Sequence, residues 1–239
     1  MMTNATIVGL TVRNGLGARR TVVLVILPVI LIGLAITVRA LVGVDEDATI
    51  GVMVGLGLTV VLPLVALIAG TSVLAAEVDD GSIVYLLAKP ISRHTIVVSK
   101  YVVALTATIL FTTLPIMLAA AIMTGELRGA IGYAAGALLG AFAYSAIFLL
   151  LSCVTRHAVA AGLLYVLIWE GLLGGLLSGV RWLSVGAWST SLADSIVHDD
   201  ILTKPVSPAY AIIATLIVTV GAVWLAGDRL RSFRLTGEE

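Results

Sequence analysis

The sequence predicts an all-α polytopic membrane protein, and three observations lead to this fold class: composition, long uncharged runs and the placement of basic residues. Of the 239 residues, 60% are hydrophobic and 12% are charged, whereas a soluble domain carries about 25% charged residues. A soluble chain of this composition would lack the polar surface needed to cover its core. The apolar runs are continuous rather than alternating with a period of two, which argues against a membrane β-barrel.

Six apolar runs approach or exceed the length of about 20 residues that a helix needs to cross the hydrocarbon core. Charged residues separate these runs, and only the fifth run contains one, Glu170. We therefore expect six transmembrane helices in a single membrane domain over residues 1–239. The six runs cover residues 21–38, 48–76, 101–125, 129–155, 158–180 and 205–227.

Basic residues between the runs predict the orientation, because Lys and Arg are enriched on the cytoplasmic side of a membrane protein. If the N-terminus is cytoplasmic, ten basic residues fall in cytoplasmic segments and four in outer segments. We therefore expect a multi-pass protein of the cell (cytoplasmic) membrane with both termini, and residues 77–100, in the cytoplasm. The four outer basic residues are Arg39, Arg128, Arg181 and Lys204.

Residues 1–20, ahead of the first run, have two interpretations. Ile7, Leu10 and Leu16 can form one face of a helix that lies on the inner leaflet. Alternatively, this stretch is a solvated basic start that only sets the orientation. The residues alone leave both interpretations open.

Residues 180–204, between the last two runs, predict short helices at the outer surface that are partly in the membrane. Trp182 and Trp188 are typical of the aromatic belt at the membrane interface. Apolar residues continue to Ile201, although His198 and two aspartates interrupt them. A structureless loop of this length would be unusual.

Glycines recur at a spacing of four in three of the runs. Small residues at this spacing allow two helix backbones to approach closely. The pattern fits packing within one bundle and also fits an interface between subunits, so both remain open. The glycines are Gly51 and Gly55 in the second run, Gly132, Gly136 and Gly140 in the fourth, and Gly171, Gly175 and Gly179 in the fifth.

The sequence contains no pattern for covalent chemistry or for a bound cofactor. It lacks the G-x-x-x-x-G-K-[ST] loop that holds ATP phosphates. The histidines fall on different loops, and Cys153 with His157 supplies too few ligands for a metal. The formal net charge is zero, which gives no electrostatic basis for binding nucleic acid. We expect no enzymatic activity, metal or cofactor in this chain.

Residues 77–100 read EVDDGSIVYLLAKPISRHTIVVSK and form the longest clearly polar stretch between two long runs. Ser82 can cap a short helix with Ile83, Leu86 and Leu87 on one face, and Pro90 ends that helix. Ser92 can cap a second helix that continues into the third run. An amphipathic helix of this kind either docks a partner or lies on the membrane surface, and the pattern alone does not choose.

This stretch, hereafter the coupling segment (residues 77–100), resembles the signature of type-2 ABC-exporter permeases. That signature has an acid, then G-[ST]-[ILV]-x-x-L-L, then P-[IV]-S-R, then a base before the next span. Asp79, Asp80 and Val84 depart from the residues common in the family. Within the family the chain is most similar to permeases grouped with copper-enzyme maturation systems. The matching residues are Glu77, Gly81, Ser82, Ile83, Leu86, Leu87, Pro90, Ile91, Ser92, Arg93 and Lys100.

The resemblance implies a permease subunit of an ABC exporter. Such a permease pairs with a second permease, identical or different, and each copy docks a separate ATPase subunit through the short coupling helix. ATP and Mg²⁺ would then be bound by the two ATPase partners and not by this chain. The resemblance also favours the interfacial-helix interpretation of residues 1–20, and it makes Glu77, the matching residues from Gly81 to Pro90, Ser92 and Arg93 the candidate ATPase-coupling residues.

Two other functions remain alternatives to an ABC permease. One is a channel or secondary transporter that needs no ATPase, although Glu170 is the only acid in any run and leaves few groups for ion coupling. The other is a membrane scaffold or maturation factor. The apolar runs are compatible with lipid-like, drug-like, peptide or sulfur-containing cargo.

Glu170 itself is a candidate functional residue, because a charge near the middle of the membrane is costly to keep. At 1.5 Å per residue it lies about 18 Å along the fifth run, near mid-membrane. It could face a substrate pathway or a subunit interface. Alternatively, it could make a structural hydrogen bond to Trp169, Ser178 or a neighbouring span.

Overall fold

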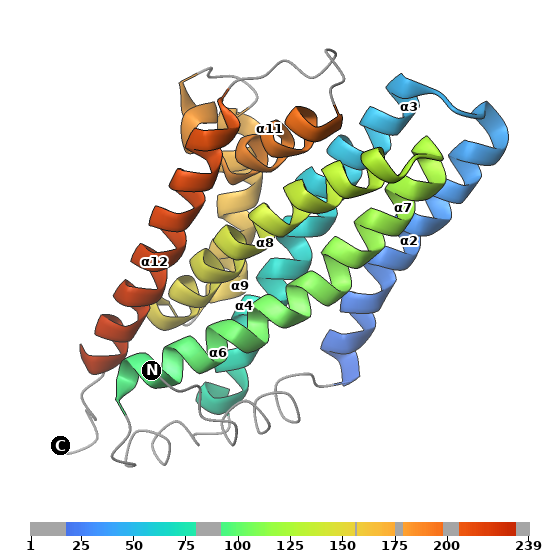
Figure 1. Cartoon of the computed structure of the whole chain (residues 1–239). Coiled ribbons are helices and arrows are strands. Elements are labelled where there is room, and N and C mark those ends of the chain that lie inside the picture. Colours follow the sequence, from blue (N-terminus) through green and yellow to red (C-terminus); the bar gives the residue numbers. More distant parts are fainter. Residues whose placement is uncertain (1–17, 80–91, 156, 175–178, 198–205, 233–239) are drawn as a thin grey trace.

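The computed structural model describes residues 18–79, 92–155, 157–174, 179–197 and 206–232, and nearly all of these residues are helical. Figure 1 shows the long helices side by side in one bundle. No strand occurs within the described ranges. The all-α fold class is therefore confirmed.

The first two long helices match the first two predicted spans. Helix α2 covers Ala18–Val42. The second is continuous from Glu46 and consists of α3 (Glu46–Ile50), the π-helical segment η1 (Gly51–Val61) and α4 (Leu62–Asp79).

The third and fourth spans are also continuous helices. Arg93 begins α6 (Arg93–Thr108), which continues through the π-helical segment η2 (Ile109–Thr113) into α7 (Leu114–Thr124). Helix α8 covers Leu127–Val154. The third helix therefore begins eight residues before the predicted run at Tyr101, within the coupling segment, as the predicted second cap at Ser92 requires.

The described residues after α8 form one shorter apolar helix, two helices of the predicted outer loop, and a final long helix. Their bounds are Ala158–Leu164 (α9) continuing into the π-helical segment Tyr165–Leu173 (η3), Val180–Leu183 (η4), Val185–Val197 (α11) and Pro208–Ser232 (α12). Among the described residues, five helices have the length and composition of a membrane span, and Ala158–Leu173 is a shorter apolar helix. The helix described in the predicted fifth span thus ends at Leu173, and residues 175–178 lie outside the described residues.

The helix ends that flank residues 80–91 lie at one end of the bundle. In Figure 1 the end of α4 and the start of α6 lie near the start of α2 and the end of α12. This arrangement agrees with a topology in which both termini and the coupling segment share one side of the membrane. Which side is cytoplasmic stays a prediction from the basic residues.

Two prolines inside the long helices follow π-helical segments. Pro63 comes two residues after η1, and Pro115 comes two residues after η2. A proline lacks the amide hydrogen, and its ring collides with the carbonyl four residues earlier in an α-helix. The wider π turn before each proline relieves that collision, and each helix is continuous through its proline.

Helix α8 lies at the centre of the bundle and packs against α4, α6, α7, α11 and α12. Its side chains include the largest fully buried ones, Tyr133, Tyr144 and Phe148. Tyr144 and Phe148 stack with ring centroids 5.8 Å apart. By contrast, α2 and α12 expose many apolar side chains on their outer faces, as helices that contact lipid or another subunit do.

The α8 glycines pack within the chain. A Cβ at Gly132 would lie 2.5 Å from Val197, one at Gly136 would lie 3.0 Å from Ala193, and one at Gly140 would lie 2.5 Å from Ser189 Oγ. Since contacts move back along α11 as they move forward along α8, the two helices are antiparallel. The bundle-packing interpretation is confirmed for this stripe.

The other two glycine stripes make no such contact within the described residues. A Cβ at Gly51, Gly55 or Gly179 would meet nothing within 4 Å, and one at Gly171 would meet only its own helix at Val166. Gly175 lies outside the described residues. The subunit-interface interpretation of these stripes stays a prediction.

The close approach of α8 and α11 predicts that Gly136→Ala destabilises the protein. The added methyl would collide with the carbonyl oxygen of Ser189, which cannot move without shifting α11. We expect a loss of about 1–3 kcal/mol in the free energy of unfolding, measured as a lower melting temperature in detergent. Gly55→Ala is the matched control, because open space surrounds that position. Equal melting temperatures for the two variants would contradict this packing.

Candidate coupling site and intramembrane carboxylate

The structure describes part of the predicted coupling segment. Glu77 falls in the last turns of α4, and Ser92 and Arg93 stand at the start of α6. The other predicted coupling residues lie outside the described residues, so their roles stay predictions; they are Gly81, Ser82, Ile83, Leu86, Leu87 and Pro90.

Ser92 caps α6 as its sequence position predicts. Its backbone is extended, with φ −62° and ψ 137°, and its Oγ accepts a hydrogen bond from the Thr95 backbone N–H at 3.2 Å. An N-cap of this kind stabilises a helix by about 1 kcal/mol, because the first amides have no acceptor within the helix. The cap therefore begins a continuous helix directly after residues 80–91.

Lys100 joins the two helices that flank residues 80–91. Its side chain is completely buried, and its Nζ donates a hydrogen bond to the backbone carbonyl of Val73 in α4 at 2.6 Å. A buried ammonium must be hydrogen-bonded, because leaving it without acceptors costs several kcal/mol. Lys100 lies in α6, on the helix predicted to run into the third span, and the structure places its side chain inside the bundle.

Apolar contacts around Lys100 extend this junction to four helices. Val73 of α4, Ile96 and Val97 of α6, Cys153 of α8 and Leu230 of α12 belong to one buried cluster. His94 also lies against α12, since a Cβ at Gly227 would collide with its imidazole ring. The start of α6 is therefore in buried contact with α4, α8 and α12.

Arg93, the first residue of α6, differs from Lys100 in its hydrogen bonding. Its side chain is partly buried, and its Nη1 is buried without a hydrogen-bond partner among the described residues. A buried guanidinium donor normally finds an acceptor. Within the coupling segment, Arg93 thus has a buried donor without an acceptor among the residues that the structure describes.

Glu170 occupies the π-helical segment η3, where it contacts the start of α11. Oε1 accepts hydrogen bonds from the Tyr165 hydroxyl at 3.2 Å and the Val185 N–H at 3.0 Å. Oε2 accepts from the Ser184 hydroxyl at 2.5 Å and the Gly186 N–H at 3.2 Å. The carboxylate therefore holds the first turn of a helix from a different segment of the chain.

These partners differ from the ones expected for Glu170. The indole of Trp169 instead donates to the carbonyl of Leu183 at 3.3 Å, and Ser178 lies outside the described residues. The sequence did contain one signal for the observed arrangement: Ser184 precedes a helical stretch in the position of an N-cap. Its Oγ accepts from the Ala187 N–H at 3.1 Å. A pathway or subunit-interface role for Glu170 stays a prediction.

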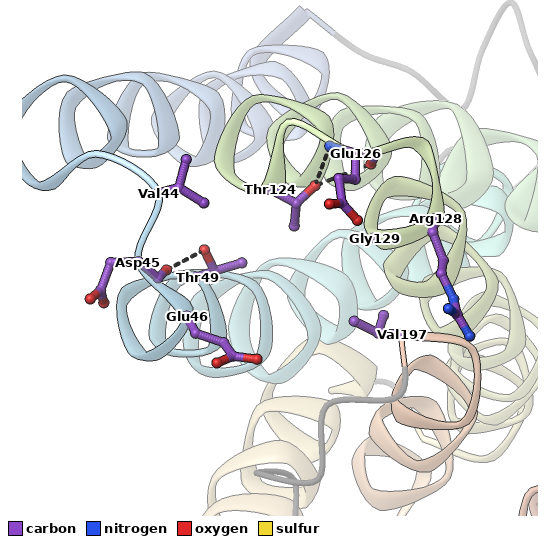
Figure 2. A pocket seen from close by; sticks show the side chains of 9 residues that line it. All are labelled: Val44, Asp45, Glu46, Thr49, Thr124, Glu126, Arg128, Gly129 and Val197. Carbon is purple, nitrogen blue, oxygen red and sulfur yellow. Dashed lines mark hydrogen bonds between the residues drawn. The ribbon is translucent and has the colours of Figure 1, made fainter.

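A cavity of about 370 Å³ lies at the opposite end of the bundle from the coupling segment. Figure 2 shows Asp45 and Glu46 on one side, and Glu126 and Arg128 on the sides formed by α7 and α8. Asp45 caps α3 through the Ala48 N–H at 2.8 Å, and the Arg128 Nε donates to the carbonyl of Ile196 at 2.8 Å. With three carboxylates against one guanidinium, the lining is negative overall.

The described residues contain no group of three or more metal-binding side chains. His94 and His157 stand at the starts of α6 and α9, and His198 is outside the described ranges. The expectation that the chain binds no metal or cofactor stays a prediction.

The buried bond of Lys100 predicts that Lys100→Met loosens the junction between α4 and α6. Methionine keeps an apolar side chain but removes the donor to Val73. We expect amide hydrogen exchange at the end of α4 and the start of α6 to become about tenfold faster or more, since a hydrogen bond from a charged group contributes about 1.5–3 kcal/mol. Arg229→Met, at an exposed cation near the same end, is the control. Wild-type exchange in Lys100→Met would show that the bond is dispensable.

Comparison with known proteins identifies the family. The sequence model of a family, described as ABC-2 family transporter protein, matches residues 5–226 of the chain. No curated protein gives a significant match to the chain. The family match spans the bundle from α2 into α12, including both helices that flank the coupling segment and the Glu170 contact. The chain therefore belongs to the ABC-2 transporter family, and it is the multi-pass permease subunit of an ABC transporter.

Proposed function

We propose that this permease exports its substrate and that a separate ATPase subunit drives it through the coupling segment. The observation that carries the proposal is the junction at Lys100, which ties α4 and α6 together beside residues 80–91. The Ser92 cap adds a fixed helix start on the other side of that stretch. A force applied to residues 80–91 would therefore turn two long helices as one unit.

The route from the coupling segment into the bundle supports the same proposal. The start of α6 shares buried contacts with α8 and α12 as well as with α4. Protein interiors are close-packed and transmit displacement with little loss. In this mechanism ATP and Mg²⁺ bind in the ATPase subunits, their closure pushes on residues 81–90, and the helices open a path toward the outer side.

The assembly that we propose contains two permeases and two ATPase subunits in the cell membrane, with the permease termini in the cytoplasm. Apolar side chains exposed on α2, η3 and α12, and the open space beside Gly51 and Gly55, leave faces that a second permease can cover. A homodimer and a heterodimer both fit these faces. Membership of the copper-enzyme maturation subgroup stays a prediction from the coupling segment.

An ATPase-independent ion-coupled transporter is less well supported. Such a transporter needs an ionisable group in the membrane that can exchange its ion or proton. The only acid in a predicted span, Glu170, already accepts four hydrogen bonds from the protein. The Lys100 ammonium is likewise engaged with α4.

The proposal predicts that an ATPase subunit co-purifies with the permease from native membranes in mild detergent, together with ATPase activity. Changing Leu86 and Leu87 to Asp should abolish that co-purification, because charge replaces the apolar face of the predicted coupling helix. The matched control changes Val44 and Leu127 to Asp. Both are exposed apolar residues at the opposite end of the bundle, and their replacement should leave the complex intact.

Two outcomes would refute this function. The first is the absence of any ATPase subunit under several detergents although the permease itself is folded. The second is equal ATPase recovery with the Leu86/Leu87 variant and with wild type, which would place the docking surface elsewhere.

A further inference from the structure

Helix α11 is held inside the bundle by two different kinds of contact. Along its length it lies against the glycine-lined face of α8, where Gly132, Gly136 and Gly140 let the backbones approach. At its start it lies beside Tyr144, because a Cβ at Gly186 would come within 3.6 Å of the Tyr144 hydroxyl. Tyr144 is about 15 Å from the end of α8 along its axis, so α11 begins well inside the bundle.

A helix that begins inside a membrane bundle has unsatisfied amides in its first turn. The Glu170 carboxylate supplies the acceptors for two of them, the N–H groups of Val185 and Gly186. Its negative charge also lies at the positive end of the α11 dipole, which favours this placement. The Ser184 hydroxyl completes the contact, since it donates to Glu170 and accepts from Ala187.

Tryptophan side chains reinforce the same contact. The Trp169 indole, one residue before Glu170, donates to the carbonyl of Leu183, and the Trp188 indole donates to the carbonyl of Trp182 at 2.9 Å. The helix that bears Glu170 is therefore bonded to both η4 and α11. Along its length α11 packs on α8 through apolar and glycine contacts, and near its end the Arg128 Nε of α8 donates to the carbonyl of Ile196.

We propose that Glu170 is a positioning residue: its carboxylate fastens the start of α11 to the fifth helix (α9 with η3), so that α11 moves with that helix when the permease changes state. The attachment of α11 to the fifth helix rests on the hydrogen bonds of Glu170 alone. The movement rests on the ATP-driven function proposed above.

Hydrogen exchange of the permease in lipid nanodiscs tests the fastening without any partner. Glu170→Gln keeps the shape of the side chain but replaces one accepting oxygen by an NH₂ group, which cannot accept hydrogen bonds from the protein donors around it. Glu170→Ala removes both accepting oxygens. Both should make the amides of Val185 and Gly186 exchange about tenfold faster or more. Residues 189–197, held by α8, should keep their protection. Asp47→Asn, an exposed acid in the first turn of α3, is the control.

Intrinsic fluorescence provides a second readout of the same contact. Trp224→Phe removes the only tryptophan outside this region, since the other three are Trp169, Trp182 and Trp188. In that background Glu170→Gln should shift the emission to longer wavelength as the indoles lose their carbonyl partners to water or lipid headgroups. If Glu170→Gln matches wild type in both fluorescence and exchange, only the shape of the side chain matters and the inference fails.

The movement is tested in the complex with the ATPase, trapped with ATP and vanadate. In wild type, trapping should change the rates of amide hydrogen exchange in residues 166–173 and 185–188 together. In Glu170→Gln, trapping should change these rates in residues 166–173 only. If the exchange rates of these two segments change independently in wild type, the inference is wrong. If no ATPase assembles with the permease, the proposed function fails, and the nanodisc experiment still decides whether Glu170 fastens α11.

Discussion

The glycine-lined face of α8 is the constraint on which the rest of this bundle depends. Gly132, Gly136 and Gly140 lack the Cβ atoms that would keep α11 away, so a thirteen-residue helix fits inside the membrane bundle. In lipid, helix association relies on packing and hydrogen bonds, because lipid tails are as apolar as leucine. The central position of α8 follows, since α4, α6, α7 and α12 surround its remaining faces.

Two charged side chains, the buried Lys100 and the partly buried Glu170, then connect neighbouring helices. Lys100 donates to the carbonyl of Val73 near the coupling segment, and Glu170 accepts from the first turn of α11 deeper in the bundle. Lys100 is held by a helix carbonyl, and Glu170 by two backbone N–H groups at a helix start and two side-chain hydroxyls. This is a low-cost way to keep a charge inside a membrane protein, because the backbone dipoles replace the lost water. One contact joins α4 to α6, and the other joins α11 to η3.

The π-helical segments show how the same chain keeps long spans continuous. The segments η1 and η2 precede Pro63 and Pro115, where the widened turn accommodates the missing amide and the ring. The segment η3 contains Glu170 and precedes no proline. Its widened turns instead place Tyr165 and Glu170, five residues apart, within hydrogen-bonding distance. Such segments recur at functional sites in helical proteins.

The sequence by itself determined the properties that depend on local pattern. Continuous apolar runs predicted the helices, Ser92 predicted the cap of α6, and the residues from Glu77 to Lys100 predicted the family. Only the tertiary structure decided which glycine stripe packs internally, that Lys100 is buried, and that Glu170 holds α11. The physical reason is separation along the chain: Lys100 lies 27 residues from Val73, and Glu170 lies 15 residues from Val185. Contacts at such distances form only when the helices pack, and no local period encodes which helices become neighbours.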